Sequence, residues 1–231
     1  KKFQQVFKET EVLTKRYNKS LTLWNLMGVS AGQIGKLDEA VLAFQNAINI
    51  KPDYAAYNNM GIALKDQGKL KKAIEIYKKA LSLKPDFSEA YNNMGVALKD
   101  QGKQGEAIEA FNKALSLKPG FSDAYNNMGN ALQEQGMMEE AIEAYKKAIA
   151  IKPNIIKSYW NLFGTAKNIN EAKKWIEQCL KADPTYEKAI LILSALKFYE
   201  GNRSEFSALI KSTYKNHPYV RSFTWAFSLP K

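Results

Sequence analysis

Pairs of adjacent asparagines recur along this chain in the motif Tyr-Asn-Asn-Met-Gly: Asn58-Asn59, Asn92-Asn93 and Asn126-Asn127. A primary amide both donates and accepts hydrogen bonds, as the backbone of an extended peptide also does. A row of such side chains therefore suits binding of a peptide main chain without reading its sequence. The same side chains also serve a structural purpose if they hydrogen-bond neighbouring backbone, and both interpretations stay open.

Residues suited to catalysis or metal binding are scarce. The chain has one histidine, His217, and one cysteine, Cys179, whereas general-base and nucleophilic mechanisms need such a group with an oriented partner. His217 directly precedes a proline and is interpreted as a cation at a helix end. Cys179 is interpreted as a small buried residue. We therefore expect no catalytic residues, no metal site, no cofactor and no enzymatic activity.

The charge balance is basic. The 231 residues include 34 Lys and Arg against 23 Asp and Glu, a net charge of +11, and the excess lies in residues 1–20 and 156–231. Nucleic acid, anionic lipid and acidic proteins all attract such a chain, but lysines on solvated helix faces are the commoner cause. No apolar run is long enough for a membrane span, and no signal peptide is evident. The expected location is the cytoplasm.

The asparagine motifs belong to a longer repeat. Their glycines Gly61, Gly95 and Gly129 are 34 residues apart, and alanine, aromatic, alanine and proline residues follow each one at fixed distances. Turn signals at Gly68 and Gly102 divide the unit into two helical segments, because glycine readily takes the left-handed conformation that ends a helix. Each unit is thus a helical hairpin, in which the small glycine lets the two helices approach closely. Two serines, Ser88 and Ser122, are expected to cap the first helices that follow them.

Four consecutive units with these markers resemble the tetratricopeptide repeat, whose spacing they match position by position. The asparagine-rich form is similar to the repeat region of O-linked N-acetylglucosamine transferases. The resemblance implies an all-α fold, a right-handed α-solenoid of stacked antiparallel helix hairpins.

In this family the first helices line a concave groove that commonly receives an extended or helical peptide of a partner protein. The resemblance carries this role to twelve residues: Asn58, Asn59, Ile62, Lys65, Asn92, Asn93, Val96, Lys99, Asn126, Asn127, Asn130 and Gln133. The row of Asn59, Asn93 and Asn127 resembles the asparagine ladder of the transferases. A carboxylate clamp for chaperone tails is not expected, because the matching positions lack its Lys or Arg and include Glu89.

The repeats set the expected organisation. It comprises a half repeat or capping helix at 1–20, hairpins at 21–53, 54–87, 88–121 and 122–155, degenerate repeats at 156–186 and 187–219, and a C-terminal capping helix at 220–231. The first segment is expected to pack through Phe3, Val6 and Leu13. Gly164 to Ala172 spans four residues fewer than Gly129 to Ala141, which predicts a first helix shortened by about one turn and a hinge there.

These features favour a protein-protein interaction scaffold that binds a peptide segment in its groove. An alternative is the N-terminal, substrate-recruiting region of a larger transferase-type enzyme, and a third is an assembly subunit that self-associates through its terminal helices. Nucleic acid is disfavoured as a partner, because the glycine, alanine and proline markers are those of the peptide-binding family rather than of its RNA-binding cousin.

Overall fold

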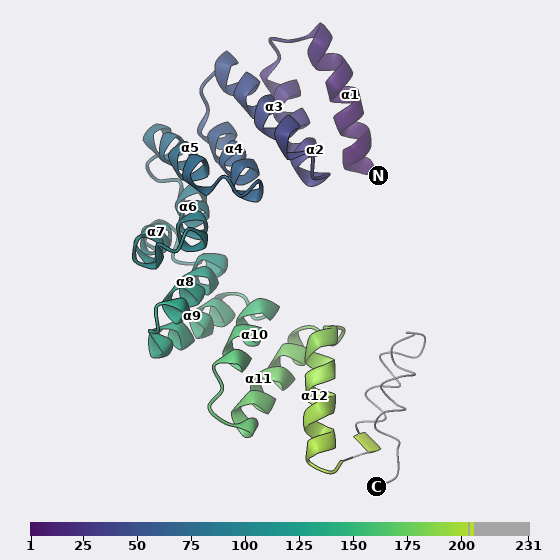
Figure 1. The fold of residues 1–231 in the computed structure, drawn as a ribbon, viewed down its shortest axis with the longest axis vertical. Helices are drawn as coiled ribbons and strands as arrows, with labels where there is room; N and C mark the ends of the chain where they lie inside the picture. The colour runs from purple at the N-terminus through teal and green to yellow at the C-terminus, as the bar shows by residue number, and fades with distance from the viewer. Residues whose placement is uncertain (203, 206–231) are drawn as a thin grey trace. The chain divides into compact units, whose positions relative to one another are not determined.

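The computed structural model describes residues 1–202 and 204–205, and within them all regular structure is helical. The chain forms two compact units, Lys1–Gly136 and Met137–Lys231. Unit 1 contains α1 Lys2–Arg16, α2 Leu21–Gln33, α3 Leu37–Ile50, α4 Tyr54–Asp66, α5 Leu70–Leu83, α6 Ser88–Asp100, α7 Gln104–Leu117 and α8 Ser122–Glu134 (Figure 1). The described part of unit 2 contains α9 Met138–Ile151, α10 Ile156–Gly164, α11 Ile169–Ala182 and α12 Glu187–Tyr199.

The all-α solenoid class is confirmed. His217, most of the second helix expected within 187–219 and the whole capping helix expected at 220–231 lie outside the described residues. None of the helices in the described ranges is long and apolar enough to cross a membrane.

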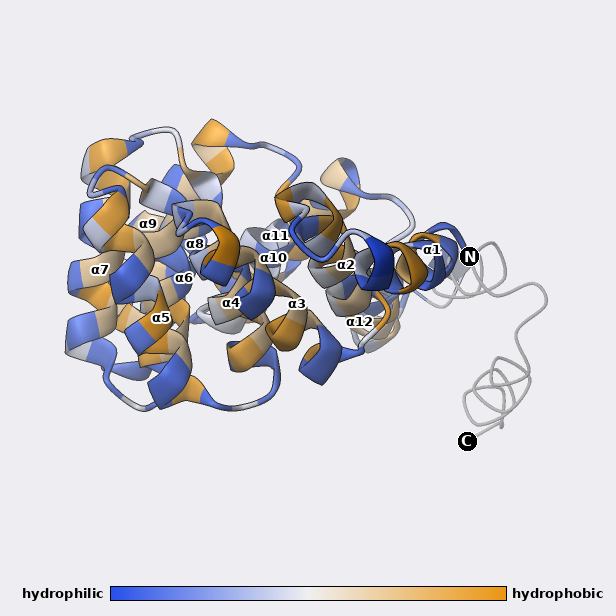
Figure 2. Cartoon of the chain, turned by 90° about the horizontal axis from the view of Figure 1, so that it is seen from above, coloured by the Kyte–Doolittle hydropathy of each residue, from blue (hydrophilic) through white to orange (hydrophobic). Residues whose placement is uncertain are grey.

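Unit 1 is a stack of hairpins. Helices α2 and α3, α4 and α5, and α6 and α7 pair within hairpins, and α1 packs on α2. Each second helix also contacts the next first helix, while α2, α4, α6 and α8 contact one another in sequence. The helices carry hydrophobic and hydrophilic residues side by side (Figure 2), as helices that bury one face and expose another must.

Glycine sets the distance between the helices of a hairpin. A Cβ atom built on Gly95 would lie 2.7 Å from Cε1 of Phe111, and one on Gly61 would lie 2.5 Å from Cε1 of Tyr77. Both rings are completely buried. The aromatic side chain of the second helix therefore packs directly on the glycine of the first, which explains why these two residue types recur together.

The turns within the hairpins follow the expectation, but the two expected helix caps do not. Gly68 and Gly102 have φ of 74° and 81°, the left-handed conformation that an L side chain resists. The prediction that Ser88 and Ser122 act as N-caps was wrong. Each is the first residue inside its helix, and the capping position is a phenylalanine, which has no hydrogen-bonding side chain.

The first helix packs mainly through residues other than those expected. In α1 the buried side chains are Phe7, Thr10 and Thr14, whereas Phe3 and Leu13 are exposed and Val6 is half-buried. Both threonine hydroxyls donate to backbone carbonyls one turn earlier in the helix. Polar residues that bond their own helix can thus be buried where a count of apolar residues predicts exposure.

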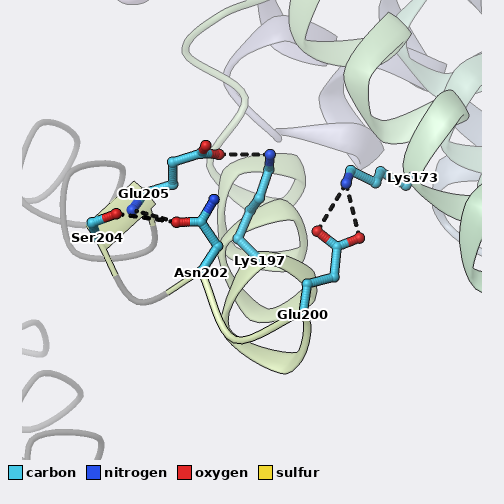
Figure 3. A network of polar contacts seen from close by, with 6 residues as sticks. All are labelled: Lys173, Lys197, Glu200, Asn202, Ser204 and Glu205. Carbon is cyan, nitrogen blue, oxygen red and sulfur yellow. Dashed lines mark hydrogen bonds and ion pairs between the residues drawn. The ribbon is translucent and has the colours of Figure 1, made fainter.

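Unit 2 contains a shortened hairpin, formed by α10 and α11. Helix α10 has nine residues where α8 has 13, which confirms the loss of about one turn. Lys173 of α11 forms an ion pair with Glu200 after α12 at 2.8 Å, and Lys197 pairs with Glu205 at 2.6 Å (Figure 3). Asn202 lies beside the second of these pairs and accepts hydrogen bonds from the Ser204 hydroxyl and the Glu205 backbone (Figure 3).

Candidate functional site

The twelve residues proposed for peptide binding all lie on α4, α6 and α8 of unit 1. We call the surface that they form the first-helix face. The residues are not equally accessible: Asn58, Asn92 and Asn126 are 7%, 8% and 2% exposed, and the other nine are half-buried. The first asparagine of each pair is therefore buried, while the other nine residues keep part of their surface exposed to solvent.

The asparagines form a hydrogen-bonded ladder across the helices. The Asn93 side-chain amide on α6 donates to Oδ1 of Asn58 on α4 at 3.0 Å. The Asn127 amide on α8 donates to Oδ1 of Asn92 on α6, also at 3.0 Å. Within the first two pairs the buried amide points at its neighbour over a longer distance, 3.5 Å from Asn58 to Asn59 and 3.4 Å from Asn92 to Asn93. We call this set the amide ladder.

The ladder follows from the repeat. Asn93 follows Asn58 by 35 residues, and Asn127 follows Asn92 by the same interval. Adjacent first helices are thus offset by one residue more than the 34-residue period. This offset brings the second asparagine of one motif against the first asparagine of the preceding motif. The residue pattern within one repeat cannot reveal this contact between repeats, although the two asparagines are 35 residues apart in the sequence.

Beyond the ladder, the first-helix face carries paired charges. Lys65 Nζ lies 2.9 Å from Asp66, and Lys99 Nζ lies 3.0 Å from Asp100 and 3.2 Å from Glu134 on α8. Burial lowers the pKa of Lys99, but the hydrogen bonds and charges of Asp100 and Glu134 outweigh it, so the pKa lies above its ordinary value. Lys99 is therefore held as a cation that joins two neighbouring helices.

An ion pair outside the predicted set joins the third hairpin at its other end. Glu89, at the start of α6, lies 2.8 Å from Nζ of Lys118, at the end of α7. The hydrogen bond from Lys118 is the main cause that lowers the pKa of the Glu89 carboxyl, and burial opposes it. The two residues are 29 positions apart, and the sequence analysis did not predict that they form a pair.

At the N-terminal end, the same side of the stack has a cavity. It lies between α2 and α4 over the floor made by Leu37 and Phe44 of α3, and its volume is about 160 Å³. Asn59 and Ile62, both in the predicted set, line its α4 side. On the α2 side the lining includes Val29 and Gly32, neither of which sequence reasoning selected for binding.

The residues considered for chemistry do not gather into a site. Within residues 1–202 and 204–205, no three His, Cys, Asp or Glu residues lie close enough together to hold a metal ion. Cys179 is completely buried on α11. Burial, assisted by the charge of Asp183, raises the pKa of its thiol to about 11. The interpretation of Cys179 as a small buried residue is confirmed.

Family comparisons agree with the repeat architecture. Tetratricopeptide repeat models match residues 33–68, 61–102, 97–136, 122–155 and 161–186. No curated protein matches the chain.

Solved structures of similar fold include tetratricopeptide repeat proteins. The protein MamA is 28% identical over 73% of this chain and 94% of its own, with a TM-score of 0.61. The Pseudomonas aeruginosa protein pilF is 18% identical over 89% of this chain and 97% of its own, with a TM-score of 0.70. YrrB, described as a TPR protein with an unusual peptide-binding site, is 16% identical over 79% of this chain and 96% of its own, with a TM-score of 0.57. Identities of this size for pilF and YrrB show the shared fold alone.

The matched repeats and the paired helices describe a protein-interaction scaffold. The chain belongs to the tetratricopeptide repeat family.

Proposed function

We propose that this chain binds an extended peptide segment of a partner protein on the first-helix face of unit 1. The observation that carries the proposal is the amide ladder, which holds Asn93 and Asn127 half-buried and fixed between neighbouring helices. Side chains already fixed by such bonds lose little conformational entropy when a ligand binds.

The ladder leaves hydrogen-bonding capacity for a ligand. A primary amide has two N–H donors and two acceptor lone pairs on its oxygen. Asn93 uses one donor towards Asn58, and among residues 1–202 and 204–205 its oxygen accepts only a long contact from Asn92. One N–H and one lone pair of Asn93 thus stay available for the C=O and N–H of a peptide main chain.

The rest of the first-helix face suits the side chains of such a peptide. Ile62 and Val96 are half-buried beside the asparagines and offer apolar contacts. Lys65 and Lys99 lie one turn further on, with their charges balanced by neighbouring carboxylates. Adjacent first helices are about 10 Å apart, so a peptide that crosses from α4 to α8 needs about six extended residues.

Affinity capture from a lysate of cells that make the protein tests the proposal. The wild type is compared with a variant in which Asn59, Asn93 and Asn127 are all changed to alanine. Asn112→Ala is the matched control, because this asparagine is exposed on α7, outside the first-helix face. We expect one partner to be retained by the wild type and by the control and lost with the triple variant.

Salt concentration separates this mode of binding from attraction to the basic chain as a whole. Hydrogen bonds to a peptide backbone persist when the Debye length falls to about 3 Å in 1 M salt, whereas contacts between exposed charges do not. Equal capture by the wild type and the triple variant, with loss of all partners at high salt, would contradict the proposal. Circular dichroism of each variant checks that helicity is retained.

A further inference from the structure

Helix α2 departs from the residue pattern of the helices that follow. Where α4 has Asn59, Ile62 and Lys65, α2 has Leu26, Val29 and Gly32, each 33 residues earlier. Leu26 and Val29 are exposed large apolar residues. The first hairpin thus continues the first-helix face with an apolar surface in place of amides and charges.

Gly32 is the reason that this surface is hollow. A Cβ atom built on Gly32 would meet no other atom within 4 Å in the described part of the chain. In the next hairpin the equivalent position is Lys65, whose side chain is 28% exposed. Between α2 and α4 the space that a side chain at position 32 would fill is instead the cavity of about 160 Å³.

We propose that this cavity, here called the anchor pocket, holds one large aliphatic or aromatic side chain of the bound peptide. The inference rests on the proposed function and adds that the bound peptide must carry one apolar residue. The volume of the anchor pocket suits such a side chain, because a cavity of about 150 Å³ lined by apolar side chains is known to admit benzene. Buried pockets that take a single large side chain commonly dominate the binding energy of an interface.

The residues that line the anchor pocket also favour an uncharged, apolar side chain. Val29, Leu37, Phe44 and Ile62 supply apolar walls. The polar lining residues are Gln33, Asn59 and Asp66. The charge of Asp66 is paired with Lys65 at 2.9 Å, so neither an acidic nor a basic anchor finds an uncompensated partner in the pocket. The partner is therefore an extended peptide with a neutral, apolar anchor at the α2 end and its main chain on the amide ladder.

Selection of peptides from a random dodecamer library on phage, with the full chain as bait, tests this inference. Affinities of the selected synthetic dodecamers are then measured by fluorescence anisotropy for the wild type, Gly32→Leu and Gly105→Leu. Gly32→Leu fills the pocket with little strain, since a Cβ there meets nothing. Gly105 on α7 also faces open space and serves as the control for a glycine replaced in a helix.

The expected result is that the selected peptides share one large apolar residue. Gly32→Leu, and serine in place of that residue, should each weaken binding by about tenfold or more, whereas Gly105→Leu should not. The two changes together should cost little more than either alone, because each removes the same contact.

Other outcomes overturn the inference in distinguishable ways. Peptides that lose affinity for the Asn59, Asn93 and Asn127 triple alanine variant but bind Gly32→Leu normally would remove the anchor pocket and retain the proposed function. Peptides affected by neither variant would contradict both. Sedimentation of the peptide-free wild type as a dimer, and of Gly32→Leu as a monomer, would assign the pocket to a second copy of the chain and overturn the peptide anchor.

Discussion

Asn59 and Asn93 occupy the same position in successive repeats but make different bonds. Asn93 donates to Asn58 across the helices at 3.0 Å, and within the described residues no corresponding bond joins Asn59 to α2. We predict that Asn93→Ala lowers the free energy of unfolding by about 1 kcal/mol, the usual net value of such a hydrogen bond. Asn59→Ala should change it by much less.

Urea unfolding followed by circular dichroism measures both variants. The comparison also separates stability from binding, because both asparagines are expected to contact a bound peptide. Equal destabilisation by the two substitutions would contradict the structural role assigned to the ladder. Asn59→Ala is consequently the cleaner variant for any binding assay.

Tyr77 gives a prediction that depends on pH. Its hydroxyl is buried without a hydrogen-bond partner within residues 1–202 and 204–205, and Phe111 fills the equivalent place in the next hairpin without a hydroxyl. Burial, and to a lesser extent the charge of Asp66, raises the pKa of Tyr77 above its ordinary value. The folded state therefore keeps the phenol protonated at a pH where the unfolded chain ionises it, and stability is lost as the pH rises above about 10.

We expect Tyr77→Phe to leave stability unchanged or to increase it at pH 8, since an unpartnered buried polar group is removed. Near pH 10.5 the stability of the variant relative to the wild type should be greater than at pH 8. Urea midpoints at the two pH values check this. A clear loss of stability at pH 8 would mean that the hydroxyl has a partner that the structure does not show.

At the scale of the helices, the contact between glycine and the aromatic ring holds each hairpin together. Gly95→Ala would place a methyl group 2.7 Å from the Phe111 ring, and overpacking of this kind typically costs about 1–3 kcal/mol. Gly105→Ala, in open space on α7, should be neutral or slightly stabilising, because alanine favours a helix. Thermal unfolding of both variants tests the difference.

A second substitution tests whether contact with the Phe111 ring causes the loss of stability in Gly95→Ala. Phe111→Leu shortens the side chain that the new methyl group would meet, so the double variant should lose less stability than the two single effects added together. Strictly additive losses would contradict a direct contact between the two residues as the source of the strain.

Sequence reasoning found the helices and their turns better than their ends. Gly68 and Gly102 were identified as left-handed turn residues because few other residues take that conformation readily. Ser88 and Ser122 were misplaced by one residue, since serine is frequent both at the cap and in the first turn and propensity does not separate the two. Asp53 does act as a cap, and its carboxylate accepts from the Ala56 amide at 2.9 Å.

The candidate site was predictable only as a set of residues. Fixed spacing placed Asn59, Asn93 and Asn127 on one face, because repeats of equal length place equal positions together. Which amide bonds which neighbour depends on the one-residue offset between helices. The anchor pocket depends on Gly32, which leaves a hollow only because the fold places it beside Val29 and Leu37. Packing between repeats, and not the pattern within one, determines these features.

At the scale of the whole chain, the shortened helix α10 predicts uneven local stability. With nine residues it has about one turn less to pack than the first helices of unit 1. We expect the amides of residues 164–170 to exchange hydrogen faster than those of 100–103, the matching turn in the third hairpin, because local opening there breaks fewer contacts. Hydrogen exchange read by mass spectrometry measures both segments, and equal protection would refute the prediction of a hinge.

In the proposed function, a partner peptide binds on the first-helix face of unit 1. Photo-crosslinking in cells that make the protein tests it most directly, with a photoreactive amino acid placed either at Val96 on this face or at Glu109, which is exposed on α7. We expect a defined crosslinked partner from position 96, which is lost when Asn59, Asn93 and Asn127 are changed to alanine, and none from position 109. Crosslinks from position 109 alone, or an adduct at position 96 that survives the triple substitution, would contradict it.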